Sequence, residues 1–260
     1  MKLSVIIPAA GSATRYGSDK LAQDLGGRPV LVRTVEFFSK RNEVAQIIVV
    51  GPPDDLDGFK ERYGPALSFL GVTIVAGGRI DRWESVQNAL DMVDADSTHV
   101  AIHDAARPAI TDELMDRLVE AAAVHEAVIP GVDLSGTIKR VSQDRIDAAE
   151  SDDLADAILG DLGKRSTSGR IVSETIDRDG LIEVQTPQIF SRELLVQAYA
   201  GSRHEGATDD SCVVENHGSP VVVVDGDPIN IKITVPADLD RIRLLMGIRS
   251  QSGRPSHKRF

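Results

Sequence analysis

Short apolar runs recur along the chain and alternate with longer segments in which apolar positions repeat every three or four residues. The longer segments predict amphipathic helices over 30–38, 86–93 and 111–122, the last one opened by Thr111 as N-cap. Strands that alternate with helices form βαβ units, so we expect an α/β fold: a Rossmann-like, mainly parallel sheet with helices on both faces. The short runs predict strands at Leu3–Pro8, Gln46–Gly51, Val72–Ala76, His99–His103, Ala127–Pro130 and Val221–Asp225.

This alternation breaks between about residues 137 and 186. Segments 137–141 and 169–176 look extended, and the stretch between them is polar and rich in Asp and Ala. The excursion is too long for an ordinary connection, so it is either a flexible insertion or an arm that projects toward a partner subunit. We therefore expect a single domain over 1–248 that includes this insertion, followed by a disordered basic tail over 249–260.

Charge and composition argue against several kinds of partner. The net charge of −11 and the aromatic content of 4% disfavour a nucleic-acid-binding surface and contact with anionic membranes. The single cysteine, Cys212, leaves no intramolecular disulfide and no cysteine metal cluster. No stretch approaches the roughly 18 apolar residues of a membrane span, and the first residues do not resemble a signal peptide, so we expect a cytoplasmic protein.

The first predicted strand runs into a loop of small residues, Ala9-Ala10-Gly11, which is followed by two cations, Arg15 and Lys20. Small residues let backbone N–H groups approach a bound anion, and spaced cations suit a triphosphate. The glycine spacing does not match a Walker A loop, and Ala13 stands where a dinucleotide fingerprint requires its second glycine. The loop therefore indicates either a nucleotide site at the end of the first strand or a tight turn without a ligand.

A second polar cluster, His103-Asp104-Ala105-Ala106-Arg107-Pro108, directly follows another predicted strand. Asp104 suits Mg²⁺ in the company of substrate phosphates, because Mg²⁺ commonly uses one or two protein carboxylates. Arg107 either helps to bind a substrate or pairs with Asp104 in a structural salt bridge. Ligands of parallel sheets bind beyond the carboxyl ends of the strands, and both polar clusters stand at such ends.

Three further segments carry polar residues that either contact a ligand or have a purely structural role. Gly77-Gly78, with Arg82 and Ser85, leads from a strand into a helix and suits either a ligand contact or a tight turn with a helix cap. Thr208-Asp209 opens a helix and is explained most simply as an N-cap. Lys232, taken alone, is explained as a surface cation.

In this order, these segments resemble the 2-C-methyl-D-erythritol 4-phosphate cytidylyltransferase family, nucleotidyltransferases of isoprenoid precursor biosynthesis. The string His-Asp-Ala-Ala-Arg-Pro at 103–108 is highly specific, and the other matches support it jointly over most of residues 3–240. The matching segments are Pro8-Ala9-Ala10-Gly11 with Arg15 and Lys20, Gly77-Gly78 with Arg82 and Ser85-Val86, the string at 103–108, Thr175-Ile176-Asp177-Arg178, Thr186-Pro187-Gln188, Thr208-Asp209 and Asn230-Ile231-Lys232.

The resemblance implies a reaction in which CTP and a sugar-alcohol phosphate, 2-C-methyl-D-erythritol 4-phosphate, give a CDP-alcohol and pyrophosphate with Mg²⁺. The attacking phosphate oxygen is largely ionised near neutrality, because its second pKa is about 6, so no general base is required. The site has to position two anions and to neutralise charge that grows on the α-phosphate and the leaving pyrophosphate.

The resemblance also implies a role for each matched residue. Arg15, Lys20, Arg178 and Lys232 form the catalytic group, in which Arg15 and Lys20 stabilise the transition state. Asp104 binds Mg²⁺. The arm contributes to a homodimer, and its Arg178, together with Thr186, reaches the neighbouring subunit's site. The implied nucleotide contacts are Ala9, Ala10, Gly11, Gly78, Arg82, Ser85, Asp104 and Arg107, and the implied acceptor contacts are Thr137, Arg178, Thr186, Thr208 and Lys232.

The sequence departs from the family at Ala13, Asp19 and Leu21, where the family usually has Gly, Pro and Gln. An acidic Asp19 beside Lys20 weakens the local positive field, so nucleotidyl transfer is indicated more firmly than the acceptor. Two alternatives stay open: a ribitol-5-phosphate cytidylyltransferase, which shares the fold and most motifs, and a catalytically inactive nucleotide-binding dimeric module.

Overall fold

The computed structural model describes residues 1–11, 16, 19–79, 81–150, 165–201, 204 and 206–248. The chain forms two compact units, one made of Met1–Val132 with the chain from Val184 onward, and one made of Asp133–Glu183. The predicted tail over 249–260 and part of the first loop, including Arg15 and Ala13, lie outside the described residues. The prediction of a single domain over 1–248 stays a prediction.

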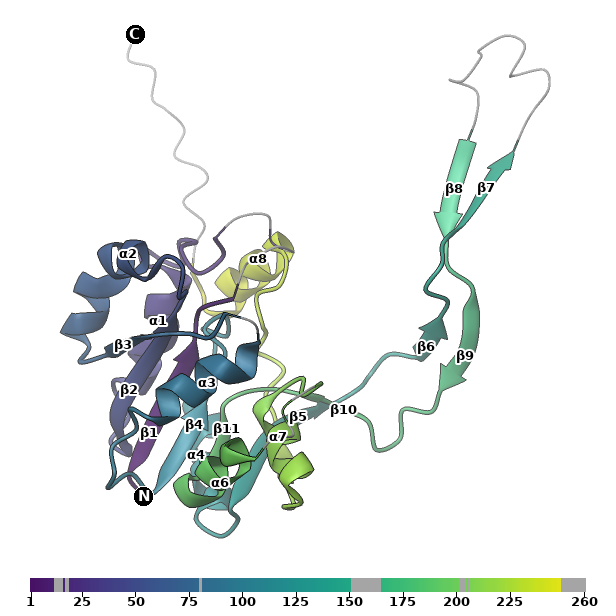
Figure 1. The fold of residues 1–260 in the computed structure, drawn as a ribbon. Coiled ribbons are helices and arrows are strands. Elements are labelled where there is room, and N and C mark those ends of the chain that lie inside the picture. The colour runs from purple at the N-terminus through teal and green to yellow at the C-terminus, as the bar shows by residue number, and fades with distance from the viewer. Residues whose placement is uncertain are drawn as a thin grey trace, which may run out of the picture. The chain divides into compact units, whose positions relative to one another are not determined.

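The first unit is built on a mostly parallel sheet in which neighbouring strands follow the order β5-β11-β4-β1-β2-β3, with β12 beside β5 (Figure 1). Strand β1 pairs in parallel with β2 and β4, β2 with β3, and β12 with β5, whereas β11 is antiparallel to β4 and β5. The α/β prediction is confirmed. The strands are β1 (Leu3–Pro8), β2 (Val44–Gly51), β3 (Thr73–Ala76), β4 (His99–Ile102), β5 (Ala127–Asp133), β11 (Gln188–Ser191) and β12 (Val222–Asp225).

Helices cover both faces of this sheet, as predicted. Alternate residues of β1 point to opposite faces, so Leu3, Val5 and Ile7 pack with α1, α2, α4 and α8, while Ile6 packs with α3, α6 and α7. Two apolar cores therefore hold the sheet between them and fix the positions of its strand ends. The helices are α1 (Val30–Phe38), α2 (Leu56–Phe69), α3 (Arg82–Leu90), α4 (Asp112–Ala122), α6 (Arg192–Ala200), α7 (Asp210–His217) and α8 (Pro236–Leu245).

Side-chain caps set the starts of α4, α6 and α7. Thr111 accepts a hydrogen bond from the backbone N–H of Leu114 at 3.3 Å, which confirms the predicted cap of α4. At α7 the cap is Asp209, which accepts from the N–H of Cys212 at 3.0 Å, while Thr208 lies exposed just before it. Within the described chain no helix is both long enough and apolar enough to cross a bilayer.

The second unit consists of two antiparallel strand pairs, which confirms the extended conformation predicted for 137–141 and 169–176. Strand β6 (Ile138–Val141) pairs with β9 (Val172–Ile176), and β7 (Ile146–Glu150) pairs with β8 (Arg165–Gly169) (Figure 1). A short strand, β10 (Ile182–Val184), then leads back to the first unit. The centre of the predicted insertion, 151–164, lies outside the described residues. Dimerisation through this arm stays a prediction.

Candidate active site

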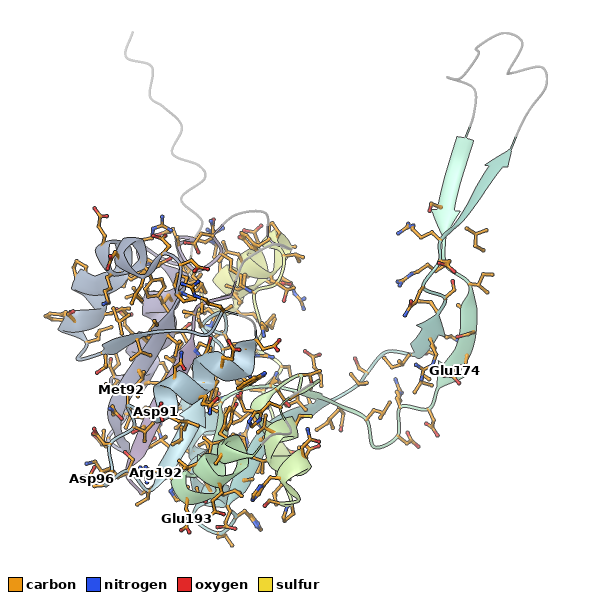
Figure 2. All side chains as sticks on the ribbon, viewed as in Figure 1. Asp91, Met92, Asp96, Glu174, Arg192 and Glu193 are labelled. Carbon is orange, nitrogen blue, oxygen red and sulfur yellow. The ribbon has the colours of Figure 1, made fainter. Side chains whose placement is uncertain are left out.

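A cavity of about 490 Å³ opens at the carboxyl ends of β1, β2, β3 and β4. This is where ligands of open α/β sheets bind, because helix N-termini and strand-end loops meet there. The far end of the sheet carries Asp96, Arg192 and Glu193 instead (Figure 2). The predicted site residues that line the cavity are Ala9, Ala10, Gly11, Lys20, Gly78, Arg82, Ser85, Asp104 and Lys232.

Asp104 is the carboxylate at the centre of this site. Its side chain is 14% exposed, and its Oδ2 lies 3.0 Å from Lys232 Nζ and 3.1 Å from Arg107 Nε. Burial raises the pKa of Asp104, but the positive charges of Lys232, Arg107 and Arg82 outweigh it and hold that pKa well below its usual value. Asp104 is therefore ionised at neutral pH.

Arg107 lies beneath this carboxylate rather than in the cavity wall, and its side chain is only 6% exposed. It pairs with Asp104 and donates from Nη1 to the carbonyl oxygen of Asn230 at 2.7 Å. The structural salt bridge, one of the two alternatives for this residue, is thus present. The same bonds tie the β4 loop to the segment that carries Lys232.

The first loop is tied to the same segment. Lys20 donates from Nζ to the carbonyl oxygen of Ile233 at 3.1 Å, and the N–H of Ile233 in turn bonds the carbonyl of Ala106 at 2.9 Å. The neighbouring Asp19 pairs with Arg62 at 2.5 Å. The acidic departure at Asp19 is therefore balanced by a cation from α2.

The glycine pair after β3 serves both as a turn and as cavity wall. The N–H of Gly78 donates to Ser85 Oγ at 3.0 Å, which holds the turn against the start of α3. A Cβ on Gly77 would lie 2.7 Å from Ser85 Oγ and 2.8 Å from the Cβ of Ala10, closer than real Cβ contacts come. Glycine at this position thus lets the β3 loop and the first loop approach each other.

Arg82 enters the cavity from the first turn of α3 and is held from behind by a buried acid. Its Nη2 lies 2.7 Å from Oδ2 of Asp210, whose side chain is fully buried at the start of α7. The Tyr199 hydroxyl donates to the other oxygen of Asp210 at 2.7 Å. Burial opposes the charge of the Arg82 guanidinium, but Asp210 outweighs this and raises the pKa of Arg82.

Other predicted site residues do not line the cavity. Thr186 is 5% exposed and lies behind Asp104, whose N–H donates to its Oγ1 at 3.0 Å. Thr208 is exposed before α7. Thr137 and Arg178 are exposed in the second unit, where Arg178 donates to the carbonyl oxygen of Ser135.

Sequence reasoning missed the cavity wall that follows β2. Pro52, Pro53 and Asp54 line it, and Asp54 pairs with Arg79 at 3.3 Å, with both side chains largely exposed. A usable signal was present, because these residues directly follow a predicted strand that is parallel to β1. The strand-end rule applied to that strand would have included them.

Asp104 suits a magnesium ion that is held by one protein carboxylate together with substrate phosphates. No group of three or more His, Cys, Asp or Glu side chains gathers to hold a metal anywhere in the described residues. Mg²⁺ does not need such a cage, because it keeps several waters and is held through one or two carboxylates plus substrate phosphates. Asp104 is ionised and lines the cavity, and it contacts both Lys232 and Arg107 through Oδ2. The donor set fits a metal carried in with a triphosphate.

Comparison with known proteins agrees with this geometry. The family model for 2-C-methyl-D-erythritol 4-phosphate cytidylyltransferase matches residues 3–158 and 154–247. Enzymes of that name from Frankia casuarinae and Bacteroides thetaiotaomicron are each 40% identical to this chain, over 92% of it and over 79% and 97% of their own lengths. The crystal structure of the enzyme so named from Thermus thermophilus superposes with a TM-score of 0.68 at 29% identity, covering 94% of this chain and 98% of that one. The chain belongs to the 2-C-methyl-D-erythritol 4-phosphate cytidylyltransferase family.

Proposed function

We propose that this protein transfers the cytidylyl group of CTP to 2-C-methyl-D-erythritol 4-phosphate, giving the CDP-alcohol and pyrophosphate. The observation that carries the proposal is the gathering of Lys20, Arg82 and Lys232 around the ionised Asp104 in one cavity. Such a concentration of cations in a chain of net charge −11 suits two phosphorylated substrates. Family membership selects the acceptor over ribitol 5-phosphate and argues against an inactive binding module.

The nucleotide enters between the first loop and the β3 loop. Ala9, Ala10, Gly11 and Gly78 bring backbone close to the cytidine, while Ser85 and Arg82 supply polar side chains from the start of α3. Lys20 then neutralises charge that develops on the triphosphate, as Arg15 is also expected to do. These assignments rest on the cavity's lining and on the family's motif pattern.

Asp104 would hold Mg²⁺ together with the phosphates of CTP. When bound, the ion neutralises charge on the α-phosphate and on the departing pyrophosphate. The protein's own part is to keep Asp104 ionised and directed at the cavity, which Lys232 and Arg107 do.

The acceptor phosphate acts as the nucleophile. Its oxygen attacks the α-phosphorus of CTP, and the bond from that phosphorus to the bridging oxygen of the leaving pyrophosphate breaks. Lys232, 41% exposed at the cavity wall, is placed to draw the acceptor phosphate toward CTP. Contacts from Thr137, Arg178, Thr186 and Thr208 stay predictions, as do the arm-mediated homodimer and the cytoplasmic location.

The test is pyrophosphate release from CTP with each candidate acceptor. We expect release with 2-C-methyl-D-erythritol 4-phosphate and much less with ribitol 5-phosphate, and chelation of divalent cations should abolish it. Preference for ribitol 5-phosphate would refute the acceptor, and release with neither acceptor would favour the inactive module.

Lys20→Ala tests the mechanism within the same assay. Because its contact strengthens as charge develops, turnover should fall about 10²–10³-fold, well beyond any change in acceptor KM. Lys40→Ala, at an exposed position after α1, is the matched control and should leave turnover unchanged. Near-normal turnover of the Lys20 variant would remove that residue from the mechanism.

A further inference from the structure

His103 is a fully buried imidazole directly after β4, next to Asp104, and the proposed reaction gives it no task. Its ring packs edge-on against Phe38 of α1, with centroids 5.0 Å apart at 66°. Its backbone N–H continues the β4 pairing by bonding the carbonyl of Ile6 at 2.9 Å. Backbone and ring are thus both fixed, which leaves two ring nitrogens whose partners can be identified.

The partners determine which nitrogen carries the proton. Nε2 lies 3.0 Å from the carbonyl oxygen of Arg107, and a carbonyl only accepts, so Nε2 is the protonated nitrogen. Full burial disfavours a charged imidazolium, so Nδ1 of the neutral ring accepts, and the Thr186 hydroxyl 3.1 Å away is its donor. Thr186 Oγ1 in turn accepts from the backbone N–H of Asp104 at 3.0 Å. Every bond in this chain therefore has one direction.

This series of hydrogen bonds encloses the turn on which Asp104 lies. It runs from the Asp104 N–H through Thr186 and His103 to the Arg107 carbonyl, and the backbone from Asp104 to Arg107 closes it. A second link extends it, because Asn230 Nδ2 donates to the Thr186 carbonyl at 2.7 Å. The segment leading to the cavity lysine is therefore tied to the same chain.

We propose that His103, as the tautomer protonated on Nε2, is a positioning residue that orients Asp104 and Arg107 through Thr186. The kinetic consequence rests on the proposed function, whereas the tautomer does not. Thr186 has one hydroxyl proton and gives it to His103, so none is left for an acceptor phosphate. The proposal therefore assigns Thr186 to holding Asp104 in place, and the variants below compare this role with the predicted contact to the acceptor.

Two variants of Thr186 separate positioning from acceptor binding. Thr186→Val removes the hydroxyl while keeping the side-chain shape, and we expect kcat to fall about 10–100-fold with a higher Mg²⁺ requirement and an unchanged acceptor KM. Thr186→Ser keeps the hydroxyl and should restore kcat. A Thr186→Val enzyme with a raised acceptor KM but normal kcat and Mg²⁺ dependence would refute the proposal.

Two variants of His103 each keep one of the two hydrogen bonds made by its ring. His103→Gln can still donate to the Arg107 carbonyl but offers Thr186 no acceptor, whereas His103→Asn can accept from Thr186 but does not reach Arg107. Both should lower kcat with little change in acceptor KM. A normal kcat in both would overturn the positioning role.

Nitrogen-15 NMR of the intact protein tests the tautomer without any activity. We expect a histidine signal with a protonated Nε2 and an Nδ1 without a proton that is missing from the spectrum of His103→Gln. The other buried histidine whose Nε2 faces a carbonyl, His204, should keep its own signal in that variant. Thr186→Val should shift the Nδ1 resonance of His103. A proton on Nδ1 would refute the inference even in an active enzyme, and the expected tautomer would support it even if no acceptor were turned over.

Discussion

The buried ion pair between Arg82 and Asp210 offers a sharp test of how the site is held. Asp210 has no exposed surface, and it receives the Arg82 guanidinium on one oxygen and the Tyr199 hydroxyl on the other. Asp210→Asn removes the negative charge while keeping an oxygen that accepts from Tyr199. The variant therefore reports on the charge pair rather than on the hydrogen bond.

The expected loss follows from burial. Removing one partner of a fully buried pair destabilises a protein by about 3–5 kcal/mol. The Arg82 side chain is 35% exposed, so water screens part of the charge left behind, and we expect about 2 kcal/mol less free energy of unfolding. For a protein of this size that is a drop of about 4–8 °C in Tm.

The assay is a double-mutant cycle by thermal and urea unfolding. Arg82→Met and Asp210→Asn, singly and together, should give a coupling free energy of about 2 kcal/mol. The control is Asp240→Asn, which breaks an exposed pair with Arg243 on α8 and should change the free energy of unfolding by less than about 0.5 kcal/mol. Because Arg82 lines the cavity, the KM for CTP should also rise in Asp210→Asn.

Either of two results would refute this reasoning. An Asp210→Asn Tm as high as that of Asp240→Asn would mean that the buried acid does not stabilise the fold. A cycle with coupling below about 0.5 kcal/mol would mean that Arg82 and Asp210 act independently.

Three further predictions follow from other contacts. Gly77→Ala would place a Cβ 2.7 Å from Ser85 Oγ and 2.8 Å from the Cβ of Ala10, so we expect a lower Tm and weaker CTP binding by calorimetry; no change in either would contradict the close approach. Arg178→Ala should impair use of the acceptor while leaving the KM for CTP unchanged; unaltered acceptor kinetics would argue that the arm does not reach a site. Burial lowers the pKa of His99 from 6.5, so the unfolded chain binds a proton at this residue more readily than the folded chain does. The contribution of the neutral His99 to the free energy of unfolding is therefore fully present above about pH 6.5 and is lost as the pH falls. Between about pH 7 and pH 5, the free energy of unfolding measured in urea should therefore fall less in His99→Gln than in the parent protein. An equal fall in both proteins would show that His99 does not cause this pH dependence.

The local sequence was sufficient to predict a strand or helix where apolar residues are dense or recur regularly. The first strand was predicted with its observed bounds, because all of its residues except Ser4 are apolar. Helix α2 was missed because its buried residues, Phe59, Tyr63 and Leu67, recur only every fourth position and Pro65 interrupts the segment. Tertiary packing stabilises this helix in spite of a weak local signal.

The site residues that stand in a motif at a strand end were predicted from the sequence. The ion pairs between residues far apart in the sequence were not. Asp104 and Lys20 stand in recognisable segments, so their place at one cavity was expected. Nothing near Arg82 in the sequence indicates that its counter-ion is Asp210, because a distant helix brings that acid in. Strand β11 likewise gives no local sign that it runs antiparallel between β4 and β5.

The cations around the cavity are paired with carboxylates. This pairing offsets the repulsion between the cations while no anionic substrate is bound. Each pair differs in exposure, and exposure decides which cation a phosphate can take over. Arg79 and Asp54 are about three-quarters exposed, so water already screens their attraction and a phosphate can replace the carboxylate. Arg82 and Asp210 are far less accessible, so Arg82 keeps its partner and serves as a fixed wall. Lys232 is 41% exposed, between the values for Arg82 and Arg79. This suits a cation that draws in the acceptor phosphate while the neighbouring cations hold CTP.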